Sequence, residues 1–316
     1  HHSFAKEELA KLQKGLSKNQ TKKAASLDPP QDQVTALLNL FKSGHFMEAE
    51  QTCRGLRQTY PQSIGVMNLL GAALKEQGKL EEALQVYENA VRTDPGIAEV
   101  HNNFGNLLKD LGRVEDALES YDKAIHVNPD FAMAYNNRGS VLQELRRMDE
   151  AVDNFGRAIQ LKPDYADAYY NRGTVLKDIE RMNEAVEDFD KAIAIEPGHA
   201  KAYNNKGLVL KDLERLDEAL ECYDRSIQLS PDYSVAHANK GLTLRLLQRW
   251  DAAIESYRRA LEIDPALELI YMPLSEVLLE TGQHKEALRL QRISQGMIYF
   301  TTDGIKFLGR KENESI

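Results

Sequence analysis

The sequence predicts an all-α protein, a solenoid of stacked antiparallel helix pairs. The evidence is that small residues, prolines and aromatic residues all recur with a period of 34 residues. Self-similarity at one fixed period of this length indicates a repeat architecture. The four columns are the glycines Gly71, Gly105, Gly139, Gly173, Gly207 and Gly241; the prolines Pro95, Pro129, Pro163, Pro197, Pro231 and Pro265; the alanines Ala83, Ala117, Ala151, Ala185, Ala219 and Ala253; and the aromatics Tyr87, Tyr121, Phe155, Phe189, Tyr223 and Tyr257.

Each unit of the repeat predicts two helices. In residues 132–165, the first half places Tyr135 and Leu142 at helical spacing, and the second half does the same with Val152 and Phe155. One helix pair cannot bury its apolar side alone, so neighbouring units must stack to form a continuous core.

The column residues explain how a unit folds. Gly139 and Ala151 are small at the points where the two helix backbones approach each other, and the aromatic column, here Phe155, is expected to fill the space between that pair and the next repeat. Pro163 cannot continue a helix and disfavours the helical conformation in Lys162, so it ends the second helix.

These columns resemble the tetratricopeptide repeat (TPR), a 34-residue helix–turn–helix with small residues at positions 8 and 20, an aromatic at 24 and proline at 32. The resemblance covers about residues 30–292 and implies a right-handed superhelical solenoid. With Ile64 as position 1, a degenerate repeat (30–63) precedes six full repeats, and a second degenerate repeat (268–292) comes after them. The full repeats are 64–97, 98–131, 132–165, 166–199, 200–233 and 234–267.

Two departures from the family pattern concern packing. Position 7 is basic in the middle repeats, where an aliphatic stem can cover apolar surface while its charge reaches water. Trp250, the only tryptophan, is expected to fill core space. The basic residues are Arg138, Arg172, Lys206 and Lys240.

The two ends of the chain fall outside the repeats. His1 and His2 are interpreted as a purification-tag remnant, and residues 4–29 predict a basic amphipathic helix followed by a linker. That helix either caps the first repeat or frays. In the tail 293–316, two β-rich runs around Asp303-Gly304 predict a short hairpin.

Composition narrows the function classes. Forty basic against forty-nine acidic residues leave a net charge of −9, which disfavours nucleic-acid binding. No apolar run is long enough for membrane insertion, and two distant cysteines suit a reducing, cytoplasmic location. Phosphate-loop, zinc-protease, nucleophile-elbow and paired-cysteine motifs are lacking, so we expect no catalytic residues, no metal, no cofactor and no enzyme activity.

A column of asparagines at position 6 is the best candidate for function. It comprises Asn103, Asn137, Asn171, Asn205 and Asn239. The family resemblance implies that positions 2, 5, 6, 9, 12 and 13 line the concave groove. An asparagine amide can pair with both the C=O and the N–H of an extended peptide. The pattern is similar to the asparagine ladder in the TPR region of O-linked N-acetylglucosamine transferase. In the alternative interpretation, these asparagines only bond to the backbone of the neighbouring repeat.

Flanking columns complete the candidate peptide-binding site. Position 5 adds three asparagines and position 12 adds three lysines, next to acidic residues at position 13 that are expected to neutralise the lysines. The added residues are Asn102, Asn136, Asn204, Lys109, Lys177 and Lys211.

The sequence thus predicts a scaffold or adaptor that binds an extended peptide or partner protein in the groove. Self-association through the open ends of the solenoid is a further expectation. The alternative is the targeting or substrate-binding region of a larger glycosyltransferase- or sulfotransferase-type enzyme, since residues 37–50 resemble the start of arrays that precede such domains.

Overall fold

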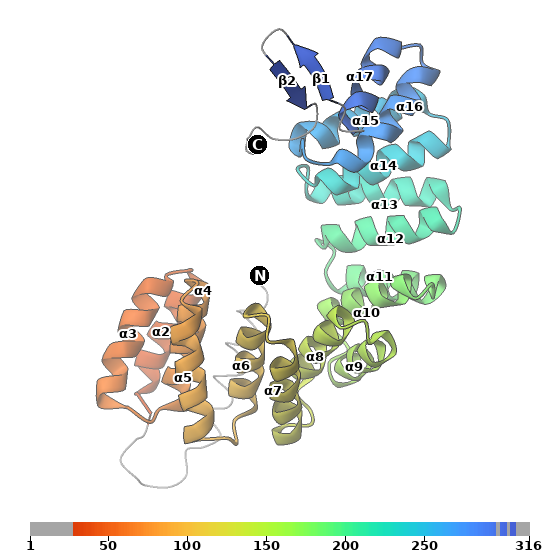
Figure 1. The fold of residues 1–316 in the computed structure, drawn as a ribbon. Coiled ribbons are helices and arrows are strands. Elements are labelled where there is room, and N and C mark those ends of the chain that lie inside the picture. The colour runs from red at the N-terminus through yellow and green to blue at the C-terminus, as the bar shows by residue number, and fades with distance from the viewer. Residues whose placement is uncertain (1–27, 295–297, 302–303, 308–316) are drawn as a thin grey trace. The chain divides into compact units, whose positions relative to one another are not determined.

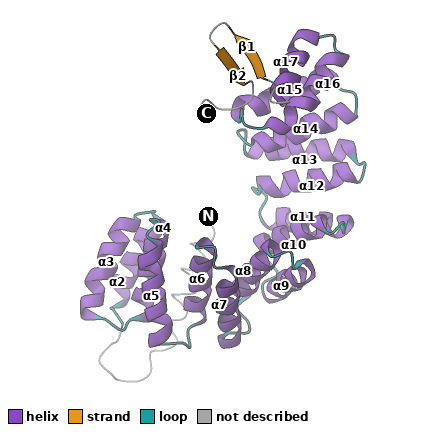
Figure 2. Cartoon of the chain, in the orientation of Figure 1, coloured by secondary structure: helices purple, strands orange, loops and turns teal. Residues whose placement is uncertain are grey.

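A computed structural model describes residues 28–294, 298–301 and 304–307 (Figure 1). The amphipathic helix predicted within residues 4–29 lies almost wholly outside these ranges. The chain divides after Pro163 into two compact units, each built of helix pairs. Secondary structure in both units is almost entirely helical (Figure 2), which confirms the predicted fold class.

The described residues of the first unit form four helix pairs, in which each helix packs against the next along the chain. The helices are α2 (Gln31–Lys42), α3 (Phe46–Thr59), α4 (Ile64–Glu76), α5 (Leu80–Thr93), α6 (Ala98–Asp110), α7 (Val114–Val127), α8 (Ala132–Glu144) and α9 (Met148–Leu161).

The second unit repeats this arrangement and ends in two short strands. Its elements are α10 (Ala166–Asp178), α11 (Met182–Ile195), α12 (Ala200–Asp212), α13 (Leu216–Leu229), α14 (Ser234–Leu246), α15 (Trp250–Ile263), the 3₁₀ helix η1 (Glu268–Ile270), α16 (Tyr271–Glu280), α17 (His284–Ser294), β1 (Ile298–Thr301) and β2 (Gly304–Phe307). The strands pair antiparallel, with Thr301 opposite Gly304. This strand pair lies in the segment for which the sequence predicts a hairpin, and the predicted turn residue Asp303 lies outside the described residues.

Helix boundaries in the full repeats follow the repeat register. Each first helix spans positions 1–13 and each second helix positions 17–30, so the proline at position 32 falls just beyond the second helix. The C-terminal degenerate repeat departs from this register at Pro273. There α16 begins only at Tyr271, which places the proline in the first helical turn, where its missing N–H has no intrahelical partner to lose.

The turn between paired helices uses a left-handed residue at position 15. Gly78 (φ 73°) donates its N–H to Lys75 O, and Lys79 donates to Leu74 O, which is the Schellman arrangement. The outer repeats place glycine here. Four middle repeats carry larger residues with φ between 57° and 62°: Arg146, Glu180, Glu214 and Gln248.

The glycine column provides space for the aromatic column of the same repeat. A Cβ placed on Gly105 would lie 2.6 Å from the Tyr121 ring, and one on Gly139 would lie 2.8 Å from the Phe155 ring. Both rings are fully buried. Trp250 is partly buried and packs on the core of the last repeats, as predicted.

Candidate functional site

The position-6 asparagines form hydrogen bonds from one repeat to the one before it. Asn103 Nδ2 donates to Asn68 Oδ1 at 3.0 Å, and Asn137 Nδ2 donates to Asn102 Oδ1 at 2.9 Å. In the second unit, Asn239 Nδ2 donates to Asn204 Oδ1 at 2.9 Å. We call these contacts the amide ladder. Its acceptors are side chains of the neighbouring repeat, whereas the alternative interpretation of the sequence expected backbone groups.

The asparagines at position 5 also donate hydrogen bonds to the position-6 asparagines of their own repeat. Asn102 Nδ2 donates to Asn103 Oδ1 at 3.2 Å, and Asn204 Nδ2 donates to Asn205 Oδ1 at 3.1 Å. Asn136 makes the same contact with Asn137 at 3.4 Å. These position-5 side chains are buried, with exposed fractions of 6% or less. Each position-6 amide that has such a partner is therefore oriented by two hydrogen bonds.

Tyr170 replaces asparagine at position 5 without breaking the ladder. Its hydroxyl lies 3.2 Å from Asn205 Nδ2 and accepts the hydrogen bond that an asparagine oxygen accepts elsewhere. Its ring lies 4.7 Å from the His199 ring, which fixes its direction. Asn171, next to it on α10, is half-buried.

The ladder leaves hydrogen-bonding capacity at position 6. A primary amide offers two N–H donors and two acceptor lone pairs. For Asn137 and Asn205, the ladder contacts use one donor and one lone pair of each. Both side chains are half-buried, as is that of Asn239, whereas Asn103 is only 7% exposed. Asn137 in the first unit and Asn205 in the second each thus present a donor and an acceptor in a fixed orientation.

The lysines at position 12 are ion-paired. Lys109 Nζ lies 2.9 Å from Glu144 of the next repeat, while Lys177 and Lys211 pair with the adjacent Asp178 and Asp212 at 3.0 and 3.1 Å. The position-13 carboxylates therefore neutralise this column, as the sequence predicted.

The basic residues at position 7 differ from the sequence prediction. Their charges do not simply reach water but form ion pairs: Arg138 with Asp122 at 2.7 Å, Lys206 with Asp190 at 2.6 Å and Lys240 with Asp224 at 2.6 Å. Their partners form a column of aspartates at position 25 of the preceding repeat, and this column is the sequence signal that could have predicted the pairs.

Arg172 uses a different partner because position 25 of the repeat before it is Gly156. It forms two hydrogen bonds of 2.7 Å with Asp188, which is 4% exposed and belongs to its own repeat. The pKa of the Arg172 guanidinium is raised, chiefly by these hydrogen bonds.

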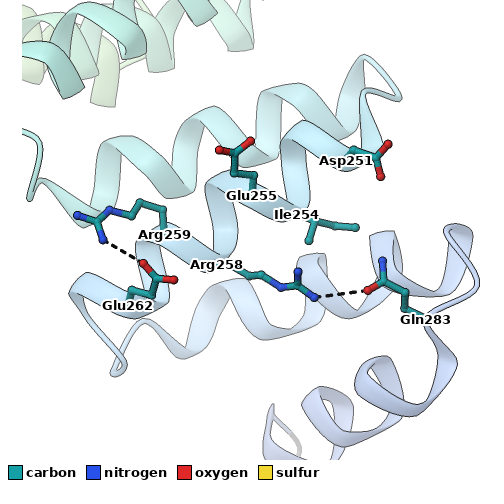
Figure 3. Close-up of a pocket in the computed structure, with 7 residues that line it drawn as sticks. All are labelled: Asp251, Ile254, Glu255, Arg258, Arg259, Glu262 and Gln283. Atoms are coloured by element: carbon teal, nitrogen blue, oxygen red, sulfur yellow. Dashed lines mark hydrogen bonds and ion pairs between the residues drawn. The ribbon is translucent and has the colours of Figure 1, made fainter.

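A pocket of about 450 Å³ lies between α15 and the turn before α17 (Figure 3). Arg258 points across it to Gln283 and pairs with Glu286 at 2.9 Å, while Arg259 pairs with Glu262 along α15. The lining mixes both charges. Within the described residues no cluster of histidine, cysteine or acidic side chains has the makings of a metal site, and no helix could cross a membrane.

Family comparisons agree with this geometry. Tetratricopeptide repeat models match residues 166–199 and 198–266, and a TPR repeat model matches residues 71–112, 105–145 and 147–180. Together these matches extend from residue 71 to residue 266, over all six glycine–aromatic pairs. The chain belongs to the tetratricopeptide repeat family. Proteins of this family mediate protein–protein interactions, and the matching models describe TPR repeats alone.

Solved structures give the same assignment. YrrB, described as a TPR protein with an unusual peptide-binding site, is 26% identical over 62% of this chain and 97% of its own, with a TM-score of 0.50. Pseudomonas aeruginosa PilF is 21% identical over 64% of this chain and 92% of its own, with a TM-score of 0.59, and this likeness concerns the fold alone. A comparison with curated proteins gives no significant match.

Proposed function

We propose that this TPR protein is an interaction scaffold that binds an extended segment of a partner along the face of its first helices. The observation that supports the proposal is the amide ladder, which orients Asn137 and Asn205 while leaving each a donor and an acceptor. An extended backbone presents both complementary groups. Packed helices have axes about 8–10 Å apart, so within each unit about three residues of extended chain would span from one asparagine to the next.

The site residues divide into three roles under this proposal. The half-buried position-6 asparagines, which exclude the buried Asn103, touch the partner's backbone. The buried position-5 asparagines act through them as positioning residues, since preorganised groups lose less freedom on binding. The position-12 lysines flank the segment. Because they are already ion-paired, they contribute little net charge that could select a partner segment with acidic or basic side chains.

The description of YrrB as a peptide-binding TPR protein supports a peptide as the class of ligand. Backbone recognition would tolerate many partner sequences, because asparagine pairs with groups that every residue carries. Selectivity must then come from side chains elsewhere on the same face.

The test uses 16-residue random peptides displayed on phage and selected on the full chain. Selected peptides are synthesised and their affinities compared between the wild type and a variant with Asn137→Ala, Asn171→Ala and Asn205→Ala. Each lost hydrogen bond contributes roughly 0.5–1.5 kcal/mol, so we expect affinity to fall by about one to three orders of magnitude. Asn183→Ala, at an exposed site on α11, is the control and should bind normally.

Stability must be measured alongside binding, because the ladder also joins repeats. Asn137 and Asn205 each make two ladder hydrogen bonds, so we expect the triple variant to unfold at lower urea but to remain helical at 25 °C. If the triple variant stays helical and binds the selected peptides as tightly as the wild type, these asparagines join the repeats but do not bind the partner.

The second candidate is the targeting region of a larger glycosyltransferase- or sulfotransferase-type enzyme. It uses the same face and differs only in whether the natural chain continues beyond residue 316. Several hundred further codons in the reading frame after Ile316 would favour this candidate, and a stop codon would favour the adaptor. We also propose that partner binding and any self-association take place in the cytoplasm.

A further inference from the structure

The face of the first helices changes from polar to apolar at its C-terminal end. Four aliphatic or thioether side chains of α14, η1 and α16 are exposed there, with exposed fractions between 37% and 67%. They are Val235 (39%), Leu246 (54%), Leu269 (67%) and Met272 (37%), and we call them the apolar end patch.

The patch continues the asparagine column. On α14, Val235, Asn239 and Leu246 are separated by four and then seven residues, which places them along one side of a helix. The partly buried Leu242 lies on the same stripe and packs on the core below. An ion pair of 2.7 Å between Arg245 and Glu276 links α14 to α16. A segment that follows the asparagines through the second unit would therefore reach the patch.

Repeat architecture does not require these apolar residues. Position 13, which is Leu246 here, is acidic in all five preceding full repeats: Glu76, Asp110, Glu144, Asp178 and Asp212. Position 2, which is Leu269 in the last repeat, is Glu99, Asp167 and Lys201 in earlier ones. Large exposed apolar side chains on a face that is otherwise polar indicate an interaction site.

The charges around the patch indicate what it would accept. Both cations of α14 are already paired, Lys240 with Asp224 and Arg245 with Glu276. Glu268 and Glu280, at the two ends of the η1–α16 stretch, are exposed and take part in no ion pair within the described part of the chain. The rim is therefore acidic and complements a basic partner.

We infer that the apolar end patch selects the partner: it accepts apolar side chains at one end of the extended segment, next to lysine or arginine. This inference rests on the proposed function, because the asparagine column would hold the backbone that carries those side chains. The ladder supplies backbone contacts shared by all segments, and the patch supplies the choice among them.

The experiment repeats the phage selection on the full chain and determines the sequences of the enriched peptides. We expect peptides with two or more large apolar residues within a few positions of a lysine or arginine. Synthetic versions should bind the variant L246D/L269E at least about tenfold more weakly, since a carboxylate loses its hydration when an apolar side chain packs against it. Aspartate and glutamate are the residues found at these positions in other repeats, so the variant should fold. Met47→Asp, a 70% exposed site on α3, is the matched control and should bind normally.

Charge reversal tests the rim independently. Glu268→Lys combined with Glu280→Lys should weaken binding of the selected peptides, and added salt, which weakens binding to the wild type, should no longer weaken binding to this variant. Enriched peptides without the apolar and basic pattern, equal binding to L246D/L269E, or failure to select any peptide would each overturn the inference.

Two further measurements test whether the protein's own tail or a second copy of the chain occupies the patch instead. A chain lacking residues 295–316 that binds the peptides at least about tenfold more tightly would assign the patch to the protein's own tail. A dimer in sedimentation that L246D/L269E dissociates would assign it to a second copy. Either result overturns the inference.

The asparagine triple variant separates this inference from the proposed function. If the peptides bind the triple variant more weakly but bind L246D/L269E as tightly as the wild type, the result supports the proposed function and contradicts the role of the patch. Peptides that show the reverse leave the patch as a docking site and remove the backbone ladder.

Discussion

Position 15 makes the strictest backbone demand on a single residue in this protein. The turn needs a positive φ, which glycine adopts freely and other residues adopt at a cost. Glu180 and Glu214 adopt φ of 62° and 60° with exposed side chains. They persist because two turn hydrogen bonds fix the backbone, for example from Glu180 N–H to Lys177 O at 3.1 Å and from Arg181 N–H to Leu176 O at 2.8 Å.

Replacing such a residue by glycine should therefore stabilise the protein. We expect Glu180→Gly and Glu214→Gly each to raise the free energy of unfolding by about 0.5–1 kcal/mol, after the entropy that glycine costs the folded state. Urea denaturation followed by circular dichroism measures this. Glu180→Ala keeps a Cβ at positive φ and should give no gain. Equal stabilisation by alanine and glycine would show that the glutamate side chain, not the φ angle, is the source of the cost.

The asparagine column itself could be predicted from the sequence, but its partners could not. The hydrogen bonds join residues 35 apart, from position 6 of one repeat to position 5 of the repeat before it. That offset depends on how far one helix pair is shifted against the next, which no spacing within a repeat reveals. Tyr170 departs from the asparagines at position 5, yet its hydroxyl accepts the equivalent hydrogen bond from Asn205.

Each of the six full repeats contains a close contact between a glycine of its first helix and an aromatic ring of its second helix. The sequence predicted the small glycines and the buried rings but expected the rings between one pair and the next repeat, whereas each ring also contacts the glycine of its own repeat. Gly105 and Gly55 are both helical, yet an added Cβ would lie 2.6 Å from Tyr121 at the first and more than 4 Å from any neighbour at the second.

Alanine substitution at these two glycines should have opposite effects. Gly105→Ala must displace a buried ring and should destabilise the protein by about 1–3 kcal/mol. Gly55→Ala removes only the entropic cost of glycine in α3 and should stabilise it by about 0.5–1 kcal/mol. Thermal and urea unfolding measure both changes. A destabilising Gly55→Ala would contradict the open space beside α3.

The junction of α3 with the turn after α4 depends on one buried carboxylate. Glu50 lies 2.7 Å from Lys79, 2.8 Å from Arg54 and 2.9 Å from Gln77. The hydrogen bond from Lys79 is the main reason that the pKa of Glu50 falls from its ordinary 4.5 to about 2. A lowered pKa in the folded state means that folding stabilises the ionised form of Glu50 relative to the unfolded chain.

Glu50→Gln should lower the free energy of unfolding at pH 7 by about 1–2 kcal/mol, since two of its partners are half-exposed to solvent. The wild type keeps this contribution above pH 4.5 and loses it as the pH falls toward 2. The difference between the two proteins should therefore narrow over that interval. Urea unfolding at pH 7, 4 and 3 measures it, and a constant difference would contradict the assigned cause.

The stability of the whole chain is a sum over repeats and their interfaces. The number and order of helix pairs in the array followed from the period. The last repeat was less predictable, because Pro273 shortens its first helix and a 3₁₀ turn precedes it. The apolar end patch could not be predicted from single residues, since each of them looks ordinary until the columns that contain them are compared.

The division after Pro163 predicts that each unit folds alone. Residues 28–163 and 164–294, expressed separately, should each be helical and unfold cooperatively, with denaturant m-values of about half that of the full chain, because m follows the surface exposed. Circular dichroism and urea titration test this for each fragment. A fragment without a cooperative transition would show that its repeats need their neighbours across the division.

The 35-residue reach of the amide ladder also has a consequence for synthesis in the cell. Each ladder bond can form once little more than one further repeat has left the ribosome, because its partner is already there. Proteins with such local contacts fold fast, and chains fold from the N-terminus as they emerge. At about 5–20 residues per second, each new repeat has a few seconds to dock before the next arrives. The nascent chain can thus add repeats one at a time, leaving only its most recent helix pair uncovered.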